Sequence, residues 1–169
     1  MRNNIRSLML GGLASLFACA ANAAPVDLSS WVAEGSGTWN LQTGNNAVLQ
    51  TVNGAPTVFH NNAASSHGQQ LSGTIQVKTT SDDDFIGFVL GYKAGDLANA
   101  STDYLLVDWK KGNKSSGGYV GAAGFGVSRI NGKRTGNPGW CHIADATQLQ
   151  RGANLGSNGR GENTNYTFD

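Results

Sequence analysis

Three adjacent aspartates, Asp82, Asp83 and Asp84, stand directly before an unbroken apolar run over residues 85–92. Carboxylate oxygens on a loop are ligands that a hard cation such as Ca²⁺ prefers, and a cation would relieve the repulsion between three neighbouring negative charges. An acidic group at the start of a strand is also typical of a solvated cap that keeps sheet edges apart. The residue types leave both interpretations open, and the spacing of an EF-hand loop is missing.

Asp108 is a second acidic residue in an unusual place, because it interrupts the apolar run over residues 104–109. A carboxylate in such a strand needs a partner. Asp108 could join the three aspartates around a cation if its strand lies beside residues 85–92. The alternative is a bond to a backbone amide, or an ion pair with Lys78 or Lys110.

Other side chains give weaker indications of chemistry. The three histidines and Cys141 lack the His-x₃-His and Cys-x₂-Cys spacings of zinc sites. A glycosidase needs two carboxylates facing each other across a groove, and Glu34 and Glu162 do not form a closely spaced pair. Trp140 follows Pro138 and Gly139, so we expect it on a surface loop where its ring could stack on a sugar.

The N-terminus predicts a secreted protein. Arg2 and Arg6 precede an apolar stretch over residues 8–18, and Ala21-Asn22-Ala23 is a small-x-small cleavage pattern. We therefore predict a signal peptide over residues 1–23 and one domain over residues 24–169. No later stretch is long and apolar enough to predict a membrane span.

The remaining sequence predicts an all-β, antiparallel sandwich. Charged residues make up only 14% of the chain and glycine is abundant, which suits short strands joined by tight turns. The predicted strands cover residues 39–41, 47–52, 57–60, 70–79, 85–92 and 103–110, with a strand-like run at 163–168. Long loops are expected after Lys114, and residues 144–151 form the only predicted helical turn.

Three segments together resemble the C-terminal domain of thrombospondins. They are Ser72-Gly73-Thr74, the acids-aromatic-x-Gly-Phe-Val-x-Gly-Tyr block over residues 82–92, and the strand Tyr104-Leu105-Leu106-Val107-Asp108-Trp109-Lys110. Residues 25–31 and 48–54 also resemble bacterial secreted proteins that carry this domain, many of which end in a PEP-CTERM sorting signal. On this resemblance the domain is expected to be incomplete at its C-terminus.

The resemblance implies a concanavalin-like, L-type-lectin-like β-sandwich without catalytic activity. It implies calcium, with Asp82, Asp83, Asp84 and Asp108 as the expected ligands, and contacts with the extracellular matrix, a cell-surface protein or a glycan. The alternative is a carbohydrate-binding, lectin-like module using Trp140, and a glycoside hydrolase is less favoured. The formal net charge of +1 gives no reason to expect a nucleic-acid partner.

Overall fold

The computed structural model describes residues 24–62, 67–153, 155 and 158–169, so the predicted signal peptide lies outside the described residues. The elements are β1 (Val32–Gly35), β2 (Trp39–Leu41), β3 (Val48–Gln50), β4 (Thr57–His60), β5 (Gly73–Ile75), β6 (Phe85–Leu90), β7 (Tyr104–Lys110), β8 (Lys114–Ser116), β9 (Tyr119–Gly121), β10 (Gly124–Ile130), α1 (Gly136–Trp140), β11 (Ala146–Arg151) and β12 (Tyr166–Phe168). Within the described part of the chain, no helix has the length and apolarity needed to cross a membrane.

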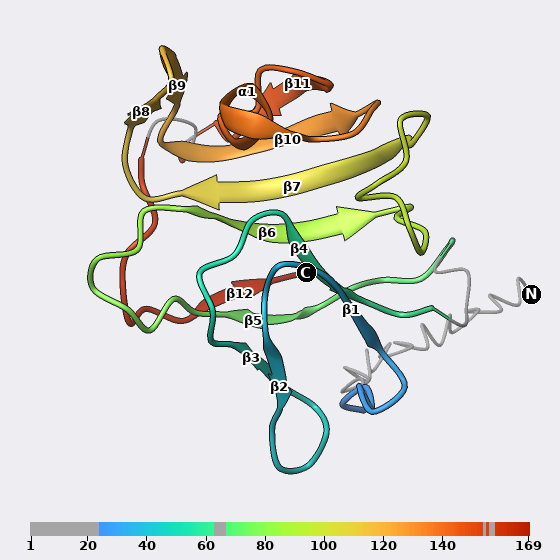
Figure 1. Cartoon of the computed structure of the whole chain (residues 1–169). Coiled ribbons are helices and arrows are strands. Elements are labelled where there is room, and N and C mark those ends of the chain that lie inside the picture. Colours follow the sequence, from blue (N-terminus) through green and yellow to red (C-terminus); the bar gives the residue numbers. More distant parts are fainter. Residues whose placement is uncertain (1–23, 63–66, 154, 156–157) are drawn as a thin grey trace, which may run out of the picture.

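The largest sheet is antiparallel, with the strand order β11-β10-β7-β6 (Figure 1). The apolar run predicted as a buried strand supplies β6, which pairs with β7 so that Phe88 faces Val107. Gly87 is required at this pairing because a Cβ there would come within 1.9 Å of the Val107 carbonyl oxygen. The close approach explains why glycine interrupts the apolar run.

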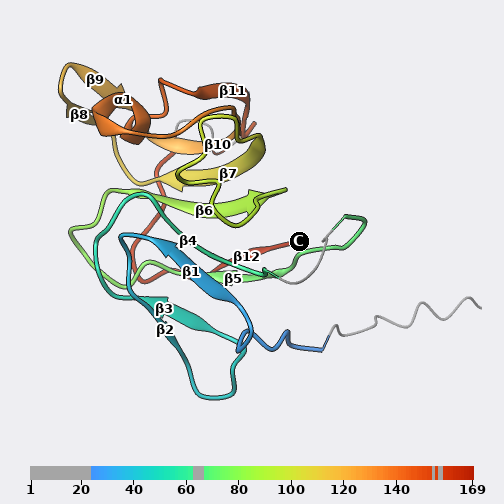
Figure 2. The same ribbon diagram turned by 45° about the vertical axis from the view of Figure 1, so that its right-hand side comes forward.

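The four-stranded sheet is covered on both faces. On one face the Phe88 ring packs on Phe168 of β12, with centroids 3.9 Å apart, and Trp109 packs on Tyr166 at 4.5 Å. On the opposite face lies the segment that contains α1, and Figures 1 and 2 both show α1 and β12 on opposite sides of this sheet. Strand β12 pairs in turn with β5.

Three further two-stranded pairings complete the fold: β1 with β4, β2 with β3, and β8 with β9. Aromatic rings join the first two of them, because Trp31 and Trp39 both stack on Phe59, at 6.0 and 5.8 Å between centroids. The indole of Trp39 also donates a hydrogen bond to Thr57 Oγ1 at 2.7 Å. The described residues are therefore mostly β with antiparallel sheets, as predicted apart from the short helix α1. The arrangement as a two-sheet concanavalin-like sandwich stays a prediction.

The part of the chain after Lys114 corrects the sequence prediction. The helical turn predicted at residues 144–151 is wrong, since Ala146–Arg151 forms β11 along the edge of β10. The helix is instead α1, which contains Pro138 in its first turn and has no side-chain cap. The predicted loops after Lys114 contain β8, β9 and β10, and the strand predicted over residues 70–79 is only β5.

Candidate functional site

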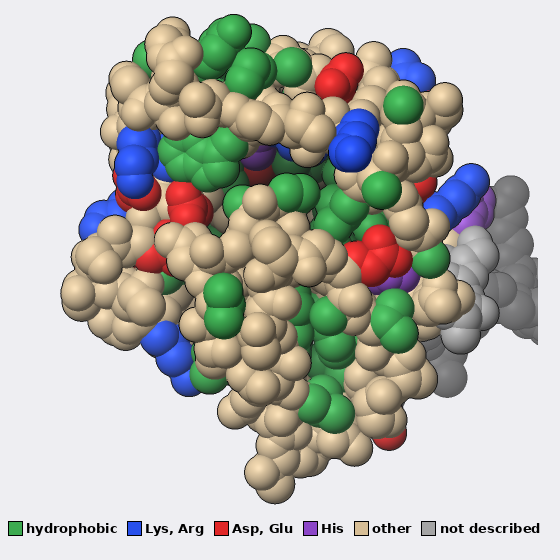
Figure 3. Space-filling model, in the orientation of Figure 1, with side chains coloured by type: hydrophobic (Ala, Val, Ile, Leu, Met, Phe, Trp, Pro, Cys, Tyr) green, Lys and Arg blue, Asp and Glu red, His purple; other side chains and the backbone are tan. Residues whose placement is uncertain are grey.

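Asp82, Asp83 and Asp84, called the acid loop below, lie immediately before β6. The loop is folded on itself, because the Asp84 backbone N–H donates to Asp82 Oδ1 at 2.9 Å. Asp83 Oδ1 lies 3.1 Å from the ammonium of Lys114, on β8. Figure 3 shows acidic and basic side chains interleaved beside a hydrophobic patch on the left of this face.

Two buried basic side chains also reach the acid loop. Lys110 is fully buried, and its Nζ donates to the carbonyl oxygen of Asp83 while lying 5.1 Å from the Phe85 ring centroid and 4.7 Å from that of Trp140. The guanidinium of Arg160 donates to the carbonyl oxygens of Asp82 and Asp84, each at 3.1 Å. The loop thus contacts cations from three separate segments of the chain.

The protonation of this cluster follows from burial and from these contacts. Burial opposes the charge of Asp83, but the hydrogen bond from Lys114 and the charges of Lys110 and Lys114 outweigh it and hold the pKa of Asp83 below its usual value. Burial lowers the pKa of Lys110, and the nearby Asp83 and Asp84 oppose that effect. The hydrogen bond to Asp83 raises the pKa of Lys114.

Asp108 lies apart from the acid loop, on the central strand β7. Its side chain is buried against His142, with Oδ2 at 3.3 Å from Nδ1, and Oδ2 makes no hydrogen bond within the described residues. The imidazole of His142 stacks on the Phe85 ring at 3.7 Å between centroids. The partners predicted for Asp108, Lys78 and Lys110, are therefore not the ones that it contacts.

The pKa values of these two buried side chains stand in the reverse of their usual order, with Asp108 above His142. Burial raises the pKa of Asp108 to about 7, although Arg134 and Arg151 oppose that shift. Burial, with the charges of Arg134 and Lys110, lowers the pKa of His142 to about 3. Over mildly acidic pH the carboxyl is therefore protonated and the imidazole is neutral, so neither group carries an uncompensated charge inside the protein.

A polar pocket of about 170 Å³ lies beside this pair. Asp108, Ser128, His142, Gln148 and Arg151 supply its polar lining, and Cys141 is among its other residues. His142 has a positive φ of 60°, so the backbone turns sharply after α1 and both Cys141 and His142 face the pocket. Neighbouring side chains point to opposite sides in an extended chain, but at this turn both line one pocket.

The four predicted calcium ligands are not brought together as one cluster. Among the described residues, no three acidic, histidine or cysteine side chains form a group that could hold a metal ion. Asp83 is paired with Lys114, and Asp108 with His142. The set of four does not fit a single calcium ion, and calcium at these residues stays a prediction.

Trp140 lies in α1 and is half-buried. Its ring faces the ammonium of Lys110 and meets Phe85 edge-on, with centroids 6.2 Å apart. The exposed loop predicted for Trp140 is therefore a short helix, and much of the ring is used in packing. Cys141, the next residue, is buried as a free thiol.

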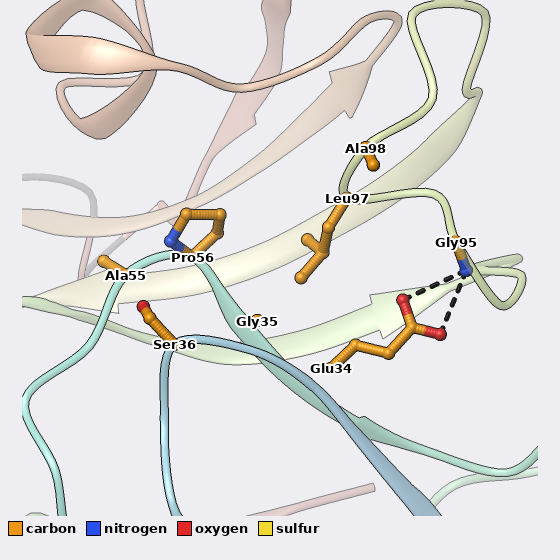
Figure 4. Close-up of a pocket in the computed structure, with 8 residues that line it drawn as sticks. All are labelled: Glu34, Gly35, Ser36, Ala55, Pro56, Gly95, Leu97 and Ala98. Carbon is orange, nitrogen blue, oxygen red and sulfur yellow. Dashed lines mark hydrogen bonds between the residues drawn. The ribbon is translucent and has the colours of Figure 1, made fainter.

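Sequence reasoning missed a polar centre at Glu34, which lies on β1, a strand that is not among the predicted ones. The carboxylate accepts a hydrogen bond from Tyr92 Oη at 2.6 Å, and the Gly95 N–H lies 3.0 Å from both carboxylate oxygens (Figure 4). His60 Nε2 lies 3.1 Å from Oε1. These bonds outweigh the effect of burial and hold the pKa of Glu34 below its usual value.

Glu34 also borders a shallow pocket of about 430 Å³ between β1 and the segment after β6. Because both carboxylate oxygens already have partners, the side chain holds the loop around Gly95 onto β1 and β4. The only signal for this role in the sequence is that Glu34 is one of two glutamates in the chain. Nothing in its spacing to Tyr92 or His60 identifies the contact.

The comparisons with known proteins agree with the sequence pattern. The family described as Thrombospondin C-terminal region matches residues 34–132, which include Glu34, the acid loop, β6, β7 and β10. No match was found among curated proteins. The match covers more than half of the chain, so the chain belongs to the thrombospondin C-terminal region family.

Proposed function

We propose that this protein is a secreted, non-catalytic and calcium-associated module that makes adhesive contacts with extracellular matrix or a cell-surface protein. The observation that carries the proposal is the family match over residues 34–132, because domains of this family are in general non-catalytic and associated with calcium. The signal peptide predicted over residues 1–23 supports an extracellular location. The resemblance to bacterial secreted proteins with PEP-CTERM signals supports a cell-surface setting.

The contacts of the two glutamates, Glu34 and Glu162, favour a binding function over glycoside hydrolysis. Glu34 is held by Tyr92, Gly95 and His60, and Glu162 is paired with Lys111. A glycosidase requires one carboxyl group free to donate a proton and a second free to act as a nucleophile or base. In this structure both glutamates have structural partners.

The test is a binding and stability measurement on the secreted protein. We expect the midpoint of thermal unfolding to be higher in calcium than in EDTA, because an ion that binds only the folded state stabilises it. We also expect calcium-dependent retention on a surface coated with basement-membrane extract. Magnesium at the same concentration serves as the control for ionic strength.

Two results would contradict the proposal in different ways. Equal midpoints in calcium and EDTA would remove its calcium component. Retention on a glycan microarray, with none on the matrix surface, would favour the lectin-like alternative, and release of product from a glycoside substrate would replace both with an enzyme.

A further inference from the structure

We infer that the acid loop binds the chain's own basic side chains, Lys110, Lys114 and Arg160, and is not the place where calcium binds. The inference rests on the proposed function in one respect, because it concerns the place where the calcium of such a module binds. It follows from the donors that already occupy the three backbone carbonyl oxygens of the loop and one carboxylate oxygen each of Asp82 and Asp83, from the burial of two of the three cations, and from their charge.

Arg160 is one of the two buried cations. Its side chain is fully buried, and besides the two carbonyl oxygens it lies 3.5 Å from Asp82 Oδ1. Its Nε and Nη1 atoms have no hydrogen-bond partner within the described residues. A buried guanidinium is tolerated only where negative charge compensates it, and the aspartates of the acid loop are the acids that it contacts.

Lys110 places a second buried charge against the same loop. Its ammonium lies between the rings of Phe85 and Trp140, where the ring faces offer partial compensation, and its hydrogen bond is to the Asp83 carbonyl oxygen. Lys114 adds a third, more exposed cation on the Asp83 carboxylate. Three aspartates are therefore matched by three basic side chains.

The same oxygens would have to serve a calcium ion. Ca²⁺ takes about six to eight oxygen ligands at about 2.3–2.6 Å. Here all three backbone carbonyl oxygens of the loop accept from Lys110 or Arg160, Asp83 Oδ1 is paired with Lys114, and Asp82 Oδ1 accepts from the Asp84 amide. An ion in the loop would also be repelled by three adjacent positive charges.

The contacts give the acid loop a structural task. Arg160 belongs to the segment that leads into β12, so the loop fastens this segment to the beginning of β6. Next to it, Gly159 passes so close to the residue after β7 that a Cβ would come within 1.5 Å of the Lys111 carbonyl oxygen, and Lys111 pairs with Glu162. The acid loop and Lys111 together hold residues 159–162 against the end of the four-stranded sheet.

The experiment compares the full-length secreted protein with the triple variant Asp82→Asn/Asp83→Asn/Asp84→Asn, each in calcium and in EDTA. We expect the triple variant to lose about 4 °C or more of its unfolding midpoint in both solutions, because two buried cations lose their counter-charges. Any calcium-induced rise of the wild type should remain in the variant. The matched control is Asp103→Asn, an exposed acid paired with Arg129, which should change the midpoint little.

The opposite pattern would overturn the inference: a triple variant that matches the wild type in EDTA and no longer responds to calcium. This outcome is distinct from failure of the proposed function, which is the absence of any calcium response in the wild type. Where the wild type does not respond, the comparison in EDTA still decides, since an unchanged midpoint there refutes the inference and a lowered one supports it.

A second measurement applies if the triple variant does not fold. Asp83→Asn alone keeps two of the three carboxylates, and terbium luminescence sensitised by tryptophan reports lanthanide binding at calcium sites. We expect the terbium affinity of Asp83→Asn to stay within about twofold of the wild type. A tenfold or greater loss, which corresponds to about 1.4 kcal/mol, would place the ion on the acid loop and refute the inference.

Discussion

Replacing Glu34 with glutamine tests whether this one carboxylate fastens the segment after β6 to β1 and β4. The carboxylate receives bonds from Tyr92, Gly95 and His60, and its side chain is only 23% exposed. Glutamine keeps one acceptor oxygen, so we expect roughly two hydrogen bonds to a charged group to be lost, at about 1.5–3 kcal/mol each. Because the site is partly exposed, we expect the free energy of unfolding to fall by about 2–4 kcal/mol.

The assay is thermal unfolding followed by tryptophan fluorescence, since Trp31 and Trp39 stack on Phe59 of β4 and report on this region. For a chain of this length, the expected loss corresponds to about 5–12 °C in the midpoint. Tyr92→Phe should cost less, because it removes one bond, and the double variant should cost less than the sum of the two single changes.

Glu162→Gln is the matched control, because among the described residues that carboxylate has a single ion-pair partner, Lys111. The reasoning is refuted if Glu34→Gln costs no more than Glu162→Gln, or if its effect simply adds to that of Tyr92→Phe. Either result would mean that the carboxylate contacts of Glu34 contribute little to holding the loop.

Two further predictions concern the pocket beside β7. In the wild type the Asp108 and His142 pair holds one proton in both folded and unfolded states between about pH 4 and 6.5, so the pair adds no pH dependence there. Relative to the wild type, Asp108→Asn should therefore gain stability as pH rises through this range, because His142 keeps its lowered pKa. His142→Gln should lose stability over the same range, because Asp108 keeps its raised pKa. Urea unfolding at each pH measures both slopes, and slopes of the same sign would contradict the assignment. Cys141 is buried, so we expect a thiol reagent such as DTNB to label it only at the rate of unfolding, and rapid labelling of the native protein would show that α1 opens.

The sheet pairing of β6 with β7 could be predicted because the apolar runs are long and a short connection joins them. The strands β8 and β11 could not be predicted, because most of their residues are polar and each pairs with a single neighbouring strand. Ala146–Arg151 shows this most clearly: its composition suits a helical turn, but the free edge of β10 satisfies its backbone hydrogen bonds. Tertiary context decided against local propensity at this segment.

The acid loop was visible in the sequence, but its partners were not. Arg160 and Lys110 are far from the loop in sequence, and no spacing rule connects a buried cation with the carbonyl oxygens that receive it. The contact between Asp108 and His142 depends on a left-handed residue directly after a short helix, which no pattern in that stretch predicts. Residue types thus indicated which segments carry charge, and the fold determined which charged side chains contact one another.

The pairing of β5 with β12 has a consequence for the order in which the protein is made. Ile75 pairs with Tyr166, so β5 leaves the ribosome long before its partner strand has been synthesised. The hairpin of β6 and β7 can form during that interval, because contacts close in sequence cost little loop entropy. Until Tyr166–Phe168 arrives, Phe88 and Trp109 lack their aromatic cover and one edge of β5 lacks a partner. The nascent chain therefore passes through a stage exposed to aggregation, during which a chaperone would have most to protect.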